Sequence, residues 1–233
     1  MNHNLSAKNH PTQHAGRRNW LFSGAILLVV VFLVWFPRLN GALFVDESAA
    51  YWMLKDGPIL AIPRAFFIPG QSSFYVAMLA IWVRIFGASE LALRAPSVLA
   101  ALASCILVIY INKMRNARIP VLASVILAMA PSMAFAATVG RPYAIGLFFC
   151  TGSIVSLSAW VKERRNILLY SSSIATVLAI YCHPTFMAIM PAQLAILSDH
   201  SVYRAHIKDL LKAGALLLFG LLPSILQCLI LTK

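Results

Sequence analysis

The residues of this chain best suited to chemistry are two adjacent carboxylates, Asp46 and Glu47, and the polar side chains Arg141, Tyr143 and His183. Neighbouring carboxylates can hold a metal ion or act as a general base toward an acceptor hydroxyl. They also suit the start of a helix, with Asp46 as its N-cap and Glu47 as a first-turn acid favoured by the helix dipole. Both interpretations of the pair stay open on the sequence alone.

A second group lies in the sequence Val-Gly-Arg-Pro-Tyr-Ala around Arg141. Gly140 permits close backbone approach, Pro142 favours a helix start and Tyr143 supplies a hydroxyl, so this junction could bind a phosphate. The alternative is an arginine that anchors a helix end at a membrane surface. His183 is either an interfacial histidine or a ligand for a metal or substrate.

The elements that position these residues are apolar. The chain is 61% hydrophobic and 11% charged, with a mean hydropathy of +0.81, which excludes an ordinary soluble domain. A helix needs about 17 to 25 apolar residues to cross a bilayer. Runs near that length predict an all-α polytopic transmembrane bundle of about seven spans. They cover residues 20–36, 93–112, 119–137, 143–161, 167–182, 184–197 and 213–231.

The formal charge of +12 points to membrane topology and not to nucleic acid, because the basic residues lie at the ends of apolar runs. The segments 1–19, 113–118, 162–165 and 204–212 each hold three Lys or Arg, twelve of the 19 in the chain. They share one side if residues 72–86 do not cross the membrane, and those residues span only about 22 Å as a helix. The basic side is then cytoplasmic, with the N-terminus on it.

This topology predicts a long outer loop over residues 37–92, with a short helix at 46–56 ended by Gly57 as C-terminal cap and an interfacial helix at 72–86. Residues 1–19 are expected to be a disordered cytoplasmic tail, followed by a retained first helix and not a cleaved signal. The four cysteines lie in or beside apolar runs and predict no disulfide or metal site. The candidate residues all fall on the outer face.

Four motifs in order carry a family resemblance. Val-Asp-Glu-Ser-Ala-Ala-Tyr at 45–51, residues 71–75 with the stretch 79–97, Gly-Arg-Pro-Tyr-Ala at 140–144 and Tyr-Cys-His at 181–183 resemble GT-C glycosyltransferases that use polyprenyl-phosphate sugars. The resemblance is to the protein O-mannosyltransferase and aminoarabinose or galacturonosyl transferase branch. It covers nearly all of residues 20–233.

The resemblance implies an inverting sugar transfer, on the non-cytoplasmic face of a bacterial inner or plasma membrane, from a lipid-phosphate donor to a lipid, glycan or protein hydroxyl. It makes Asp46 the general base or a carboxylate that orients the acceptor, and Glu47 a supporting carboxylate. Donor-binding positions would be Arg141, Tyr143, His183 and Gln71, and a divalent metal could bind at Asp46, Glu47 and His183.

Two departures from the family pattern stand out. Ser72-Ser73 replaces a common Pro-Pro, and the family members are about twice as long, so we expect the chain to be incomplete at its C-terminus. The alternatives are a transporter or flippase-like membrane protein, or a non-catalytic half that binds a lipid-linked sugar or a partner. Transporters commonly show internal repeats and mid-membrane ionisable groups, and neither is evident in the sequence.

Overall fold

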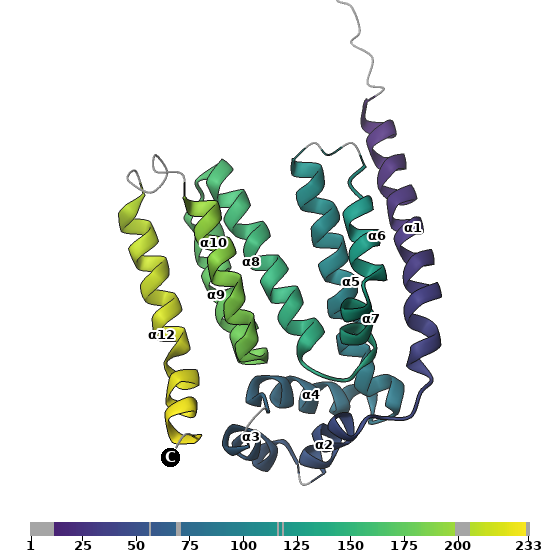
Figure 1. Ribbon diagram of the computed structural model, residues 1–233, viewed down its shortest axis with the longest axis vertical. Coiled ribbons are helices and arrows are strands. Elements are labelled where there is room, and N and C mark those ends of the chain that lie inside the picture. Colours follow the sequence, from purple (N-terminus) through teal and green to yellow (C-terminus); the bar gives the residue numbers. More distant parts are fainter. Residues whose placement is uncertain are drawn as a thin grey trace, which may run out of the picture.

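The computed structural model describes residues 12–55, 57–68, 71–115, 117, 119–198 and 206–231, which are helical and contain no strand. Figure 1 shows one set of helices running alongside one another. This set comprises α1 (Thr12–Leu39), α5 (Glu90–Met114), α6 (Leu122–Met129), α7 (Pro131–Thr138), α8 (Tyr143–Glu163), α9 (Asn166–Cys182), the 3-10 helix η1 (Pro184–Ala188), α10 (Ile189–Leu197) and α12 (Ile207–Leu231).

Four of the described helices have the length and apolar composition to cross a membrane. These are Phe22–Leu39 within α1, Glu90–Met114, Tyr143–Glu163, and Ile207–Gln227 within α12. The protein is therefore an all-helical membrane protein as far as the described residues show. The count of about seven spans stays a prediction, because it depends on α6 with α7, on α9, and on η1 with α10, which are each shorter.

Two of the helix breaks coincide with a proline. The run 119–137 was expected as one helix, but it forms α6 and α7, which meet at Ala130 with ψ 130°. A residue before proline is pushed out of the helical region by the proline ring, and Ala130 precedes Pro131. The same effect holds His183 extended before Pro184, at φ −162° and ψ 136°, so that a single 3-10 turn joins α9 to α10.

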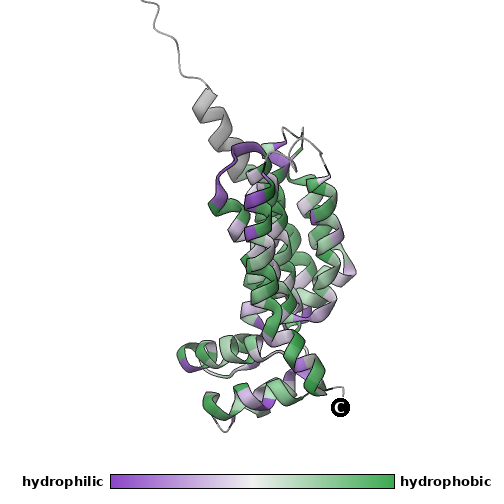
Figure 2. Ribbon diagram, turned by 90° about the vertical axis from the view of Figure 1, so that its left-hand side faces the viewer, coloured by the Kyte–Doolittle hydropathy of each residue, from purple (hydrophilic) through white to green (hydrophobic). Residues whose placement is uncertain are grey.

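Three short helices lie across one end of this bundle (Figures 1 and 2). They are α2 (Val45–Leu54), α3 (Pro58–Phe67) and α4 (Ser73–Phe86), and α4 is the helix expected at 72–86. Their position outside the hydrocarbon layer stays a prediction, but their orientation across the bundle agrees with it. The connection from α1 to α5 thus covers the end of the bundle at which Asp46 lies.

The structure excludes one of the two interpretations of Asp46 and agrees only in part with the expectation for Gly57. The residue before the first turn of α2 is Phe44, so Asp46 lies inside the helix and is not its N-cap. Gly57 has φ +91°, immediately precedes α3, and donates its N–H to the Leu54 carbonyl at 2.9 Å. It therefore starts α3 as well as closing the turn after α2. In addition, α1 begins at Thr12, inside the segment expected to be disordered, and residues 1–11 lie outside the described residues.

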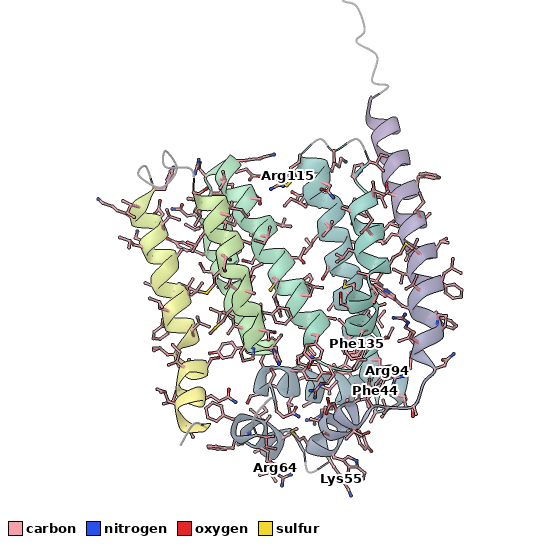
Figure 3. The ribbon with its side chains drawn as sticks, viewed as in Figure 1. Phe44, Lys55, Arg64, Arg94, Arg115 and Phe135 are labelled. Carbon is pink, nitrogen blue, oxygen red and sulfur yellow. The ribbon has the colours of Figure 1, made fainter. Side chains whose placement is uncertain are left out.

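The basic connections lie together at the opposite end. Lys162 Nζ at the end of α8 donates a hydrogen bond to the Met114 carbonyl at the end of α5, at 2.8 Å. Figure 3 shows Arg115 at this end, whereas Lys55 and Arg64 lie at the end that carries α2 to α4. Two of the basic connections expected on one side, those after α5 and after α8, therefore lie at the same end of the bundle.

Candidate functional site

Glu47 is the most buried acid of the site and forms an ion pair with Arg94 of α5. The two residues are 2% and 1% exposed. Glu47 Oε1 accepts hydrogen bonds from Arg94 Nε at 3.0 Å and the Gly140 N–H at 2.5 Å. Its Oε2 accepts from Arg94 Nη2 at 2.9 Å and the Phe44 N–H at 2.8 Å. Each oxygen of the Glu47 carboxylate thus accepts two hydrogen bonds.

The hydrogen-bond donors of Arg94 are also fully used. Its Nη1 donates to the carbonyls of Leu39 and Gly41, both at 2.7 Å, and its Nη2 also donates to the Ala42 carbonyl at 3.0 Å. Together with the two bonds to Glu47, these contacts use all five N–H groups of a guanidinium. Arg94 therefore fixes the segment between α1 and α2, and with it the start of the helix that carries Asp46 (Figure 3).

These contacts keep Glu47 ionised. Burial by itself raises the pKa of Glu47, but the hydrogen bonds from Arg94, Gly140 and Phe44 outweigh burial and hold that pKa below its usual value. A proton acceptor must have an accessible lone pair near its target. The geometry therefore favours Glu47 as a positioning residue, and its role as a supporting catalytic carboxylate stays a prediction.

The junction between α7 and α8 is attached to the same pair. Besides the Gly140 N–H contact with Glu47, the Arg141 carbonyl accepts a hydrogen bond from Ser97 Oγ of α5 at 3.1 Å. A Cβ at position 140 would lie 3.1 Å from the Leu93 carbonyl oxygen and 3.2 Å from Glu47 Oε1, closer than most real contacts. Glycine at this position lets the backbone approach Glu47, whereas the sequence had suggested a close approach to a phosphate.

Asp46 faces away from this buried pair and meets Arg141. Its Oδ2 lies 3.5 Å from Arg141 Nη2, and its side chain is 70% exposed while that of Arg141 is 11% exposed. Arg141 Nη1 also donates to the Asp46 carbonyl at 3.4 Å. Among the described residues Arg141 Nε is buried without a hydrogen-bond partner. An accessible carboxylate thus lies beside a guanidinium with an unused donor.

Tyr143 and His183 extend the cluster. The Arg141 guanidinium carbon lies 5.9 Å from the centre of the Tyr143 ring, and the Tyr143 and His183 rings are 5.5 Å apart. His183 Nδ1 lies 2.8 Å from Thr185 Oγ1 and 3.3 Å from the Thr185 backbone nitrogen, so Thr185 occupies this ring nitrogen and Nε2 makes neither contact. The sequence prediction that these motifs share one site agrees with these distances.

Among the described residues Gln71 makes no hydrogen bond or ion pair with that cluster, but its neighbour Ser72 contacts the same end of α9. Ser72 Oγ donates to the Tyr181 carbonyl at 2.6 Å, two residues before His183, and accepts the Tyr75 N–H at 3.0 Å to cap α4. Gln71 itself is partly buried, and its N–H donates to the Ile68 carbonyl at 3.2 Å. Its proposed donor contact stays a prediction.

Sequence reasoning missed the structural importance of Arg94 and of Tyr75. Arg94 lies at the start of the apolar run 93–112, and a charge in such a run signals a partner or a function. Tyr75 is 2% exposed, and its hydroxyl has no hydrogen-bond partner among the described residues. Burial raises the pKa of Tyr75, and the positive charge of Arg141 opposes that rise. Nothing in the sequence distinguished this tyrosine from other aromatic residues of the stretch.

The proposed metal at Asp46, Glu47 and His183 stays a prediction. The part of the chain that the structure describes contains no group of three or more His, Cys, Asp or Glu close enough to hold an ion. The four hydrogen bonds to Glu47 occupy both of its oxygens, so a metal there would have to displace donors.

We expect Arg141→Gln to raise the pKa of His183. Partial burial and the charge of Arg141 both lower that pKa from its ordinary 6.5. Removing the charge deletes the second cause, so protonation should begin at higher pH. Histidine ring resonances followed by NMR as a function of pH would measure the change, with His206, at the other end of the bundle, as an internal control. A His183 titration unaltered by Arg141→Gln would show that the charge of Arg141 does not influence the pKa of His183.

Comparison with protein-family models, curated proteins and solved structures finds no match to this chain.

Proposed function

We propose that the protein is a membrane glycosyltransferase that moves a sugar from a polyprenyl-phosphate donor to a hydroxyl of a lipid, glycan or protein acceptor. The observation that carries the proposal is the pairing of the exposed Asp46 with Arg141 at 3.5 Å. Sugar transfer from a lipid phosphate needs a base for the nucleophile and positive charge for the departing phosphate. The pair supplies both groups side by side.

In the proposed reaction, Asp46 accepts the proton of the acceptor hydroxyl while the hydroxyl oxygen attacks the anomeric carbon from the side opposite the phosphate. The bond between that carbon and the phosphate oxygen breaks, and the configuration inverts. Arg141 then offsets the negative charge that collects on the phosphate. In this proposal Tyr143 and His183 contribute hydrogen bonds to the phosphate or the sugar. Glu47 and Arg94 hold Asp46 in place and exchange no proton.

We place the site on the non-cytoplasmic face of a plasma membrane. The support is its position at the end opposite the basic connections around Lys113 and Lys162, since cytoplasmic loops are enriched in Lys and Arg. A polyprenyl-phosphate sugar that reaches this face keeps its headgroup at the membrane surface, level with α2 to α4. The acceptor would approach from the aqueous side, where Asp46 is exposed.

The orientation predicts a difference in thiol labelling. A cysteine at Lys55 should react with an impermeant maleimide added outside intact cells, and a cysteine at Arg115 should react only after the cells are opened. Both side chains are exposed and lie at opposite ends of the molecule in Figure 3. Cys105, Cys150 and Cys182 are buried, so their background should be low. Labelling of Arg115→Cys from outside would overturn the assignment of faces.

The variant Arg141→Gln tests the function. A hydrogen bond to a charged group contributes about 1.5 to 3 kcal/mol, so we expect kcat/KM for the lipid-phosphate donor to fall by roughly 10- to 100-fold. The matched control is Arg38→Gln. It removes an exposed arginine from the last turn of α1, at the end of the bundle where Arg141 lies. Equal transfer by wild type and Arg141→Gln, in membranes with equal amounts of each protein, would count against phosphate binding by Arg141.

A further inference from the structure

A groove of about 720 Å³ lies between α9, α10 and α12, and none of the residues of the Asp46 site lines it. Its walls are mainly apolar, with Leu169 of α9, Leu194 and Leu197 of α10, and Leu211 of α12 among them. The volume falls within the range of pockets that bind small molecules. In this membrane protein it lies along α12, so the surrounding solvent is lipid.

The groove approaches the basic end of the bundle. Ser198 and Ile207, which flank the connection between α10 and α12, both line it. Lys208 and Lys212 follow on α12 and are exposed. Of the described acids nearby, Glu163 lies 3.9 Å from Arg165, and Asp209 lies 3.9 Å from His206, which carries a charge only when it is protonated. Among the described residues at this end, which we call the rim, the bases Arg164, Arg165, Lys208 and Lys212 outnumber these two acids.

Two buried hydrogen-bond donors next to the lining of the groove have no acceptor among the described residues. Trp160 is fully buried and packs with Leu157, Leu169 and Ala213, which line the groove. Its Nε1–H has no partner among the described residues, and neither does the buried Nη1 of Arg164. The guanidinium carbon of Arg164 lies 5.2 Å from the centre of the Trp160 ring. Buried donors without an acceptor are costly, and an anionic oxygen would satisfy them.

We propose that the groove and its rim bind an anionic glycerophospholipid, with one acyl chain along the groove and the phosphate at Arg164. Acyl chains are as apolar as leucine side chains, so the groove alone gives little selectivity among lipids. Selectivity comes from the headgroup, and basic pockets between membrane helices on the cytoplasmic side suit anionic headgroups. This site is independent of sugar transfer, because it lies at the opposite end of the bundle from Asp46.

Gly214 provides the test for the groove. It lines the groove on α12, and a Cβ there would meet no atom within 4 Å, so the backbone at this position leaves room for the side chain of Gly214→Leu to start into the groove. The control Gly24→Leu places the same side chain on α1, where nothing lies within 4 Å either. Native mass spectrometry of protein from vesicles of equal phosphatidylglycerol and phosphatidylcholine should show about tenfold more bound phosphatidylglycerol for wild type and Gly24→Leu. Gly214→Leu should lose most of it.

Arg164→Asn provides the test for the rim. Arg164 has φ 56°, a backbone region that asparagine tolerates, and it closes the end of α8. The variant should lose the preference for phosphatidylglycerol, whereas Arg165→Gln, which removes the neighbouring charge with a side chain 70% exposed, should keep it. Three results would overturn the proposal: equal retention of both lipids by wild type, unchanged retention by Gly214→Leu, or the mass of a second protein copy in place of lipid.

Discussion

Replacing Asp46 by Asn is expected to lower the rate of sugar transfer by about 10²- to 10⁴-fold, the usual contribution of a general base. The amide has nearly the same shape but cannot accept the proton of the acceptor hydroxyl. The fold should be little affected, because the Asp46 side chain is 70% exposed and only its ion pair with Arg141 is lost. Initial rates normalised to the amount of folded protein would measure the effect.

The matched control for Asp46→Asn is Glu90→Gln. Glu90 is an exposed acid in the first turn of α5, at the same end of the bundle, and the change removes one charge in the same way. We expect it to keep close to the wild-type rate. Transfer by Asp46→Asn at the rate of Glu90→Gln would remove Asp46 from the chemistry.

Glu47→Gln is expected to act on stability first, with a cost of about 3 to 5 kcal/mol, because it leaves the buried guanidinium of Arg94 without its counter-charge. One amide oxygen also cannot accept the four hydrogen bonds that the two carboxylate oxygens accept. The segment between α1 and α2 should then loosen, and the activity of the remaining folded protein should fall with it. Thermal unfolding in mild detergent would report the loss.

A double-mutant cycle separates positioning from proton transfer by Glu47. Arg94→Met alone leaves the Glu47 carboxylate buried and unpaired, whereas the double variant Glu47→Gln with Arg94→Met buries no charge. The double variant should therefore be less destabilised than the sum of the two single variants. A Glu47→Gln protein that unfolds at the wild-type temperature yet transfers no sugar would instead show that Glu47 takes part in the chemistry.

The different environments of Asp46 and Glu47 show how far the sequence could predict the site. It identified both carboxylates, together with Arg141, Tyr143 and His183, from motifs. It could not tell which carboxylate faces inward, because neighbouring helical residues point about 100° apart and either face could have packed on α5. The decision came from Arg94, whose contact with Glu47 joins distant parts of the chain.

The sequence likewise predicted some features of the fold and not others. Apolar runs and basic ends indicated a helical membrane protein, and hydropathy is enough for that because it depends on composition. The break between α6 and α7 was missed, although Pro131 signals it, because the apolar run continues through the proline. The start of α1 at Thr12 was missed because polar residues without periodicity resemble a tail. The ends of these helices therefore depend on local backbone effects that composition does not report.

The most direct test of the account follows a labelled sugar on polyprenyl phosphate in vesicles that contain the protein and an acceptor. The account predicts that the label leaves the lipid phosphate, appears on an acceptor hydroxyl with inverted anomeric configuration, and does so far more slowly with Asp46→Asn. A transporter or flippase would instead move the labelled lipid between leaflets with the sugar still attached. Label that stays on the polyprenyl phosphate while the lipid changes sides would contradict the proposed sugar transfer.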